Sequence, residues 1–334
     1  MYGIAAALLN HLPFASYPYR GEARPCNLCG HGEATLVCRY DRRMKRLTTV
    51  RCDGCGLLRT DPMPTEAELG AYYASAYRGD YQLARRTPPR LHLKRSRRES
   101  EARMALLAPL LRPASHILDF GSGSGEFLDL ATKAGHSATG IEPGRDFARY
   151  AREAYGADVH IGPWTGIDLP EGGFDLITAR HVLEHLRDPV DALRRMADWL
   201  APDGVIHVEV PNAEAIRKDA LQQFHFAHIH HFSPTTLAHA GAKAGLEADP
   251  RFPGEGTTMV FRKRQADTPV MSAAGVMPAV DPRLARLTPF THLASGIWAE
   301  SLLRRMGKAF ADLGPRLPPP PRTAHAAGIV SARR

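Results

Sequence analysis

The chain has 334 residues, of which 44% are hydrophobic and 23% charged, and its formal net charge is +8 at pH 7. This length and apolar content allow a substantial core with room for two or three modules. No apolar run reaches the length needed to cross a bilayer. The opening segment MYGIAAALLNHLPF lacks the basic start and the small-residue cleavage site of a secretory signal. We therefore expect a cytoplasmic protein.

Four of the five cysteines form two closely spaced pairs, Cys26-Asn-Leu-Cys29-Gly and Cys52-Asp-Gly-Cys55-Gly. Each C-x-x-C-G turn directs two thiolates at one ion, so two turns supply four ligands for tetrahedral zinc. Segments 34–40 and 46–51 alternate like short strands, which predicts a zinc ribbon. Disulfides are the alternative, but a reducing compartment disfavours them. Four protein ligands leave no position for a catalytic water, so the predicted zinc is structural.

Segment 62–90 follows the cysteines, and a short helix is expected to start at Thr65. Four tyrosines come next, and they are Tyr72, Tyr73, Tyr77 and Tyr81. They either pack one module against its neighbour or form a lid that offers hydroxyl groups to a polar substrate. Arginines then crowd segment 85–103. We interpret this part as an amphipathic helix with its arginines in solvent and with four apolar residues inward: Leu93, Ala102, Leu106 and Leu107.

The segment HILDFGSGSGEFL, which begins at His116, predicts a strand, a glycine turn and a helix. Glycine lets the backbone approach a ligand closely because no Cβ stands in the way. A second strand, HSATGIE, ends in Glu142, whose carboxylate could accept both hydroxyls of a ribose. Nucleotide-like ligands bind at the carboxyl ends of such strands. A dinucleotide is disfavoured, because the glycine spacing differs from G-x-G-x-x-G and Glu126 would repel a pyrophosphate. S-adenosylmethionine, a cationic ligand without phosphate, suits this loop.

Further strands and helices alternate after this loop. FDLIT ends before His181-Val-Leu-Glu-His185, a helical pattern runs over 189–200, and a fifth strand, VIHVEV, is closed by Pro-Asn. Segments 246–252 and 257–263 read as a final antiparallel pair. Alternation of this kind predicts a parallel sheet covered on both faces.

The ordered string D-x-G-x-G-x-G, then FD, HVLEHL, DP, L-x-P-x-G and PN, resembles the class I S-adenosylmethionine-dependent methyltransferases over residues 105–264. The resemblance implies an α/β, Rossmann-like core, a doubly wound sheet with an antiparallel last strand. The zinc ribbon and the tyrosine segment are similar to those of methyltransferases that act on sugars and other small molecules in bacterial biosynthesis. The cofactor-binding residues that it implies are Asp119, Gly121, Ser122, Gly123, Gly125, Glu142, Pro143, Gly162, Trp164, Arg180 and His181.

Two histidine clusters are candidates for catalysis. In the first, Glu184 would orient His181 or His185 as a general base near neutral pH. The alternative is a structural HVLEH segment in which His181 touches the cofactor. In the second, 225–231, the spacing could bind a metal, but no Asp or Glu lies nearby in sequence. We expect one histidine of this cluster to face the substrate. The catalytic candidates are His181, Glu184, His185, His228 and His231.

The basic charge keeps an RNA methyltransferase as an alternative. However, no aromatic residues alternate with the arginines, as single-strand binding would require. No N-P-P-[YF] signature and no Pro-Cys nucleophile is present either. An anionic small molecule explains the charge equally well, so we do not expect nucleic acid as the partner. A cofactor-binding scaffold without catalysis is the second alternative.

The C-terminal part is expected to contain a linker over 269–289, a helix over 290–313 and a disordered end. The helix could dock on its own core, on a second subunit to form a homodimer, or on a membrane surface. We therefore predict a methyltransferase for a hydroxyl or carbon of a small, sugar-containing acceptor. Its parts are an N-terminal segment (1–22), a zinc ribbon (23–61), a Tyr- and Arg-rich linker or lid (62–104), the S-adenosylmethionine-binding domain (105–264) and a helical C-terminal extension (265–334).

Overall fold

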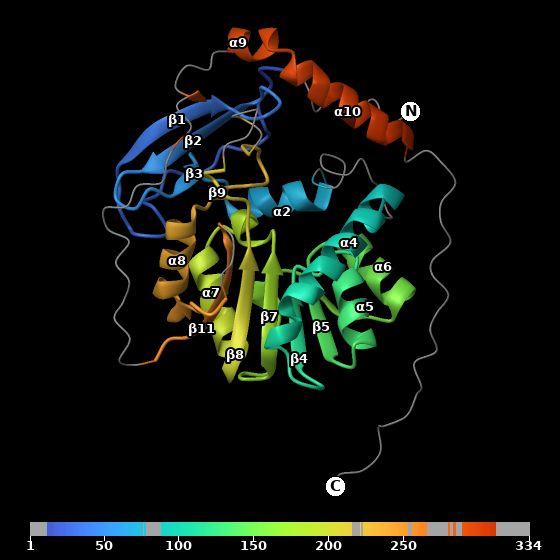
Figure 1. Ribbon diagram of the computed structural model, residues 1–334. Coiled ribbons are helices and arrows are strands. Elements are labelled where there is room, and N and C mark those ends of the chain that lie inside the picture. Colours follow the sequence, from blue (N-terminus) through green and yellow to red (C-terminus); the bar gives the residue numbers. More distant parts are fainter. Residues whose placement is uncertain are drawn as a thin grey trace.

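The computed structural model describes residues 12–75, 77, 88–215, 221, 223–252, 256–265, 280, 283–284 and 289–311. A small sheet lies above one edge of a larger α/β domain, and two C-terminal helices run across the top (Figure 1). Tyr81 and the predicted disordered end, 318–334, lie outside the described residues. Among the described residues, no helix combines the length and the apolar character that crossing a membrane requires.

The larger sheet has seven strands in the order β10-β11-β8-β7-β4-β5-β6. Strands β6, β5, β4, β7 and β8 run parallel, and β11 is antiparallel to both β8 and β10. This arrangement confirms the predicted doubly wound sheet with an antiparallel last strand. The strands are β4 (His116–Phe120), β5 (Ser137–Glu142), β6 (Asp158–Ile161), β7 (Phe174–Arg180), β8 (Leu200–Glu209), β10 (Leu246–Ala248) and β11 (Thr258–Lys263).

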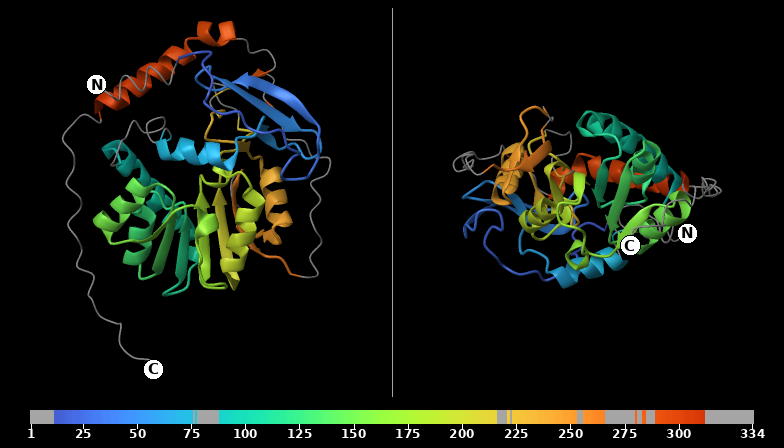
Figure 2. Two further views of the ribbon diagram at one scale, coloured as in Figure 1. Left: turned by 180° about the vertical axis from the view of Figure 1, so that it is seen from behind. Right: turned by 90° about the horizontal axis from the view of Figure 1, so that it is seen from below.

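Helices follow the parallel strands in alternation (Figure 2). The strand order runs outward from β4 in both directions, so right-handed crossovers place α5 and α6 on one face of the sheet and α7 on the other. The helices of this domain are α4 (Arg90–Leu107), α5 (Glu126–Lys133), α6 (Arg145–Tyr155), α7 (Pro189–Trp199) and α8 (Pro234–Lys243).

Local chemistry explains several boundaries. Ser233 caps α8, because its hydroxyl accepts from the backbone N–H of Thr236 while the Thr236 hydroxyl accepts from the N–H of Ser233. Strand β4 has four buried residues in a row, as a central parallel strand requires. Strand β8 begins at Leu200, which pairs with Phe174 of β7, and after a register shift the regular pairing resumes at Val205.

Helix α4 corrects the predicted orientation of the Arg-rich segment. Leu107 is buried, as expected, whereas Ala102 and Leu106 are exposed. Arg103 is buried instead, with its guanidinium 3.8 Å from the centre of the Phe127 ring. The prediction of solvated arginines is therefore wrong at this position. A buried carboxylate, Asp119, selects which face of the helix turns inward.

The N-terminal module is a four-stranded antiparallel sheet in the order β1-β2-β3-β9. Its strands are β1 (Ala34–Tyr40), β2 (Arg46–Cys52), β3 (Leu58–Thr60) and β9 (His230–His231). Strand β9 belongs to the histidine segment that follows β8, so the larger domain contributes one strand to the small sheet. The buried cluster that contains Leu28 and Leu57 also contains Leu183 and Phe232. The two modules therefore share one core.

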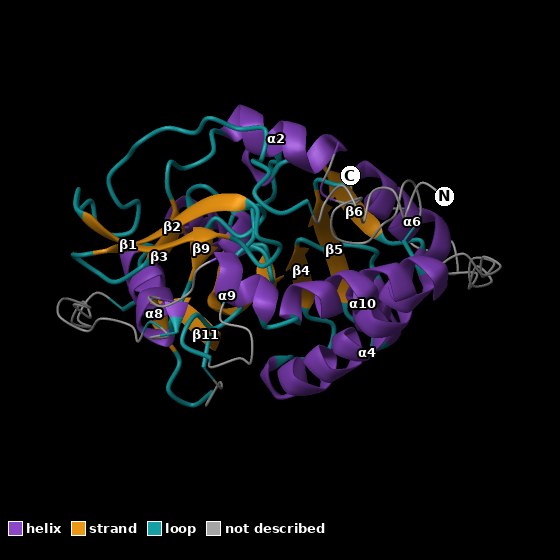
Figure 3. Cartoon of the chain, turned by 90° about the horizontal axis from the view of Figure 1, so that it is seen from above, coloured by secondary structure: helices purple, strands orange, loops and turns teal. Residues whose placement is uncertain are grey.

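Helix α2 (Glu66–Ser75) lies between the small sheet and the larger domain (Figure 1). Thr65 and Glu68 cap its start reciprocally. Toward the C-terminus, the predicted single helix is two helices, α9 (Pro289–Ala294) and α10 (Ile297–Ala311), because Gly296 adopts a positive φ of 74° between them. Leu293 and Trp298 pack on the apolar cluster of the small sheet. In the view from above, α10 lies over the region between β5 and α4 (Figure 3).

Candidate active site

The predicted cofactor loop lies at the point where the strand order reverses. Strand β4 has β5 on one side and β7 on the other. The loops after β4 and β7 therefore diverge there, which leaves the crevice in which ligands of doubly wound sheets bind. The glycine loop follows β4, and His181 follows β7.

The glycine loop is held open by its own backbone bonds. The N–H groups of Gly121 and Ser122 both donate to the carbonyl of Ile141, at 2.9 Å. A Cβ on Gly121 would lie 2.4 Å from Val182 Cγ2, so the loop packs directly against the HVLEH segment. A Cβ on Gly123, by contrast, would meet nothing within 4 Å. The loop therefore presents an open backbone surface, which fits a closely bound ligand.

Glu142, the predicted ribose ligand, is buried at the end of β5 and braces the glycine loop. Its Oε2 accepts from the N–H of Gly123 at 3.0 Å, and its Oε1 accepts from the N–H of Gly144 at 2.7 Å. A carboxylate oxygen has more than one lone pair, so these bonds leave acceptor capacity for hydroxyl groups. The binding of a ribose diol there stays a prediction.

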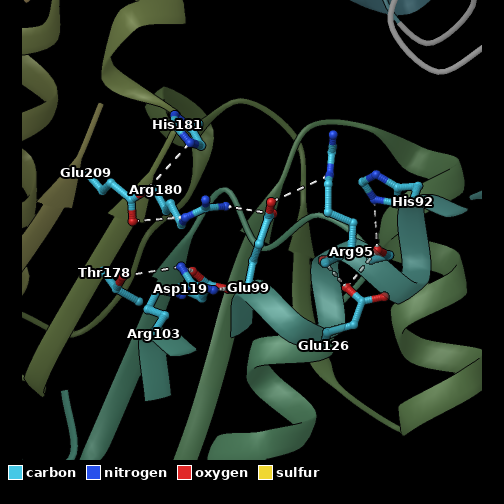
Figure 4. Close-up of polar contacts among 12 residues, drawn as sticks. His92, Arg95, Glu99, Arg103, Asp119, Glu126, Thr178, Arg180, His181 and Glu209 are labelled. Carbon is cyan, nitrogen blue, oxygen red and sulfur yellow. Dashed lines mark hydrogen bonds and ion pairs between the residues drawn. The ribbon is translucent and has the colours of Figure 1, made fainter. Parts of the chain in front are cut away.

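Asp119 forms a buried ion pair that sequence reasoning missed (Figure 4). Its side chain is 1% exposed, and its two oxygens lie 3.0 and 3.2 Å from Nη1 and Nη2 of Arg103. Burial raises the pKa of Asp119, and Arg103 opposes that shift. The predicted contact with a cofactor ammonium is untested, but the carboxylate already has a cationic partner. The sixteen-residue separation of Arg103 and Asp119 offers no periodic signal that could have revealed this pair.

Arg180 links three elements above the sheet. Its guanidinium lies 3.1 Å from Glu99 on α4 and 3.0 Å from Glu209 at the end of β8 (Figure 4). His181 lies 3.7 Å from the same Glu209. Arg180 therefore anchors α4 over the carboxyl ends of β7 and β8. Its predicted contact with the cofactor stays a prediction.

Glu126 is buried at the start of α5 and is held by two hydroxyl groups. Its Oε2 accepts from Ser96 and Ser124, each at 2.8 Å. Burial raises the pKa of this carboxyl. The remaining predicted cofactor residues lie around the same crevice without a tested role: Ser122 is buried, Gly162 and Trp164 are partly buried beyond β6, and Pro143 is exposed after β5.

The predicted catalytic residues gather around one buried carboxylate. Glu184 is 1% exposed, and its Oε1 lies 3.3 Å from Nδ1 of His181. The same oxygen lies 3.8 Å from Nε2 of His185 and 3.7 Å from Nε2 of His228. The structure thus brings His228 to the HVLEH segment from more than forty residues away along the chain. His231 lies behind His228, with ring centres 6.4 Å apart.

His181 is the most exposed member of this cluster, at 40%, and it has a positive φ of 52°. Such a backbone angle is uncommon outside glycine and often marks a functional position. In the second segment His225, His230 and His231 are buried and His228 is 14% exposed. Burial lowers the pKa of His228 well below its usual value and that of His231 to about 3. They are therefore neutral at pH 7, and His181 is the accessible imidazole.

The tyrosine segment contacts this cluster. The hydroxyl of Tyr73 lies 3.0 Å from Nδ1 of His185, and the ring of Tyr77 meets the same imidazole edge-on. Tyr72 is buried against Phe226. Tyr72 therefore packs the modules together, as in the first alternative, and Tyr73 reaches the catalytic candidates. The lid over a polar substrate stays a prediction.

The four predicted zinc ligands converge. Their Sγ atoms all lie within 4.8 Å of one another, with Cys26 to Cys55 at 3.7 Å and Cys29 to Cys52 at 3.4 Å. Zinc–thiolate bonds of about 2.3 Å in a tetrahedron separate the sulfurs by about 3.8 Å, so the cluster fits zinc. Cys38 is a partly buried strand residue, and burial raises the pKa of its thiol to about 11.

Asn27, inside the first cysteine pair, connects the ribbon to the catalytic candidates. Its amide Nδ2 donates to the carbonyl of Arg187, just past the HVLEH segment, at 2.5 Å. Its Oδ1 lies 3.1 Å from Nε2 of His230, and Nδ1 of the same histidine lies 3.0 Å from the carbonyl of Leu186. The cysteine turn therefore contacts both segments that carry the catalytic candidates. Sequence reasoning missed Asn27, because it assigned this turn only to zinc.

Residues 92–250 match the family model described as a methyltransferase domain. C-methyltransferase NovU of Streptomyces niveus is 28% identical over 136 residues, which cover 39% of this chain and 32% of NovU. A ubiquinone biosynthesis O-methyltransferase of Actinobacillus pleuropneumoniae is 33% identical over 107 residues, covering 29% of this chain and 45% of the relative. A tRNA U34 carboxymethyltransferase of Syntrophotalea carbinolica is 35% identical over 119 residues, covering 33% and 37%.

The matches thus span less than half the length of each of these three relatives. Among solved structures, the sugar N-methyltransferase KedS8 from Streptoalloteichus aligns with a TM-score of 0.41 at 18% identity, over 50% of this chain and 87% of that one. Residues 92–250 thus match a methyltransferase domain model, and the strand order described above is the one predicted for the Rossmann-like core.

Proposed function

We propose, on the premise that residues 92–250 form a methyltransferase domain, that this protein transfers a methyl group from S-adenosylmethionine to a small, sugar-containing metabolite. One observation carries the proposal. The open glycine loop braced by Glu142 and the histidine cluster around Glu184 lie on neighbouring loops at the strand-order reversal, and Gly121 packs against Val182 between them. A cofactor in the first site would face an acceptor beside the second.

S-adenosylmethionine supplies an activated methyl group when it is bound. The protein then has to hold the acceptor in line, exclude water and accept a proton from a hydroxyl or an acidic carbon. His181 is the proposed proton acceptor, since it is accessible and Glu184 lies 3.3 Å from its Nδ1. Glu184 would stabilise the imidazolium that forms. The Tyr73 hydroxyl, beside His185, is placed to hold a polar acceptor.

The two kinds of relative guide the choice of acceptor. NovU is a C-methyltransferase and the ubiquinone relative an O-methyltransferase, so either a carbon or a hydroxyl remains open as the methylated atom. The tRNA relative keeps RNA as the alternative acceptor. A metabolite is favoured because the arginines nearest the crevice, Arg103 and Arg180, are committed to carboxylates instead of facing a phosphate backbone. A scaffold without catalysis is the third candidate.

We further propose that Cys26, Cys29, Cys52 and Cys55 hold structural zinc, on the strength of the sulfur geometry given above. Reduced cysteine pairs of this kind suit a cytoplasmic location. A homodimer through α10 stays a prediction, supported by Leu303, which is 66% exposed on this helix.

Native mass spectrometry of the freshly purified protein tests the cofactor and the zinc together. A mass excess of one zinc plus S-adenosylmethionine or its demethylated product supports the proposal, and a dinucleotide adduct contradicts it. In calorimetric titrations with S-adenosylmethionine, Glu142→Ala should lose about 1–3 kcal/mol of binding free energy, the range for a charge-assisted hydrogen-bond partner. Glu153→Ala, on the exposed side of α6, is the matched control. Equal affinity of the two variants would refute the assignment of Glu142.

The acceptor class is tested separately. A steep loss of RNA binding with rising salt would favour RNA modification. Tight cofactor binding without turnover on any metabolite extract would favour the scaffold. Transfer of a labelled methyl group to a small molecule in the extract is the result that the proposal expects.

A further inference from the structure

We infer that Glu184, His185 and His228 form a second metal site, for a divalent transition-metal ion, beside the proposed acceptor position. The inference deepens the proposed function, since the ion would bind the acceptor oxygen. The first observation that supports the site is the burial of the Glu184 carboxylate. This carboxylate is 1% exposed, and neither of its oxygens accepts a hydrogen bond from any described residue. A buried carboxylate without compensation is costly, so a cation or a proton has to balance it.

The contacts around Glu184 have the spacing of ligands that share an ion. Its Oε1 lies 3.8 Å from Nε2 of His185 and 3.7 Å from Nε2 of His228, and the three ligand atoms lie within 4.8 Å of one another. These separations are too long for direct hydrogen bonds. Metal bonds of about 2.0–2.2 Å place the ligand atoms of one ion roughly 3–3.5 Å apart. The two Glu184 contacts therefore have to close by a few tenths of an ångström, and the two histidine nitrogens, which lie within 4.8 Å of each other, by at most about 1.5 Å.

The tautomer of His185 supports the same conclusion. Its Nδ1 lies 2.8 Å from the carbonyl oxygen of Ala227, which can only accept, so Nδ1 carries the hydrogen. In the neutral ring, Nε2 therefore presents a lone pair on the side of Glu184. A histidine that donates one ring N–H to a backbone carbonyl and binds metal through the other nitrogen is the usual arrangement in metal sites.

The backbone holds the two contributing segments together. The N–H of Ile229 donates to the carbonyl of Glu184 at 2.9 Å, and Tyr73 lies against His185 from a third segment. The site is therefore built into the fold. The carboxylate that the 225–231 histidines lack in sequence comes from Glu184 in the tertiary structure.

Two histidines and one carboxylate are the ligand set of catalytic zinc and of iron(II) sites with open positions. Imidazole nitrogens favour zinc, cobalt, nickel or iron over magnesium or calcium. An open position would bind the hydroxyl or enolisable carbonyl oxygen of the acceptor. The bound cation would lower the pKa of that group, and the proton would pass to His181. The closed four-cysteine cluster has no such position, so the two metal sites have different roles.

The test is a titration of the full-length, zinc-loaded protein with Co²⁺ alone, followed by visible absorption and metal analysis. We expect one cobalt per chain beyond the zinc, with d–d bands and without the thiolate-to-cobalt charge transfer that exchange at the cysteines would produce. Glu184→Gln and His228→Gln should each weaken cobalt binding at least about tenfold, the lower end of the effect of altering a metal site's supporting groups. His116→Gln, at an exposed position outside the cluster, should bind as the unaltered protein does.

Absence of cobalt binding beyond the cysteine site, or equal binding in the Glu184 and His116 variants, would overturn the inference. Circular dichroism and titration with S-adenosylmethionine show whether each variant has kept its fold. The metal titration needs neither cofactor nor acceptor. It can therefore fail while cofactor binding and methyl transfer succeed, and it can succeed if the proposed reaction is wrong.

Discussion

The buried pair of Arg103 and Asp119 allows a quantitative test of how α4 is held on the sheet. Arg103→Met removes the guanidinium while keeping most of the side-chain volume over the Phe127 ring. The two side chains are 9% and 1% exposed, so the substitution leaves a buried, uncompensated carboxylate. Removal of one partner from such a pair costs about 3–5 kcal/mol. We expect a loss of this size in the free energy of unfolding, measured by urea denaturation at pH 7.

The matched control is Arg112→Met. Arg112 also pairs with an aspartate, Asp175, but its side chain is 68% exposed, and such surface pairs contribute about 0–1 kcal/mol. The double variant Arg103→Met/Asp119→Asn should be more stable than Arg103→Met alone, because no buried charge then remains. A loss in Arg103→Met no larger than in Arg112→Met would refute the reasoning, as would additive effects in the double variant.

The penalty should also depend on pH. Burial raises the pKa of Asp119, and Arg103 is the main group that opposes this. In Arg103→Met the pKa of the folded state therefore lies further above that of the unfolded chain. The folded variant then binds more protons than the unfolded one, so a fall in pH toward the ordinary aspartate pKa should reduce the penalty. A penalty that grows between pH 7 and pH 5 would contradict this sign.

Three further predictions concern the glycine loop and the ribbon. Gly123→Ala should cost only about 1–2 kcal/mol of stability, because alanine is strained at the positive φ of this position. Gly125→Ala should cost about 1–3 kcal/mol more, since its Cβ would lie 2.6 Å from Ala151 Cβ. Urea denaturation measures both losses, and equal losses would contradict the packing argument. Asn27→Ala should lower methyl transfer without changing the affinity for S-adenosylmethionine, because the substitution releases the two histidine segments and leaves the glycine loop intact. Unchanged turnover would show that the Asn27 amide does not position these segments. Cys52→Ser should lose the proposed structural zinc and lower the thermal midpoint, because the cysteines share a core with the larger α/β domain. A variant without zinc but with an unchanged midpoint would refute the structural role.

Local signals were sufficient for the main elements of the chain. The two C-x-x-C-G turns converge as predicted, because each turn sets the direction of two thiolates within five residues. The loop from Gly121 to Gly125 and the start of α8 at Ser233 also follow from short-range chemistry, namely positive φ angles and a capping box. The alternation of strands and helices was enough to predict a parallel sheet covered on both faces, since parallel strands need crossover helices. The doubly wound order was implied by the family resemblance.

Other features depend on contacts between distant segments. Helix α4 turns Arg103 inward, against its amphipathic pattern, because Asp119 on β4 needs a buried cation. The break between α9 and α10 at Gly296 was not predicted, because the apolar pattern of segment 290–313 continues through this glycine. Strand β9 joins the ribbon, and His228 reaches Glu184, only when the segment after β8 folds back over the sheet.

The sequence by itself thus determined the glycine turn, the convergence of the cysteine pairs and the alternation of strands and helices, since backbone turns and ligand spacings act over a few residues. The partners of the charged and imidazole groups were decided only by the tertiary structure. The cost of burying a charge depends on every segment packed around it, and no local pattern in the chain encodes that environment.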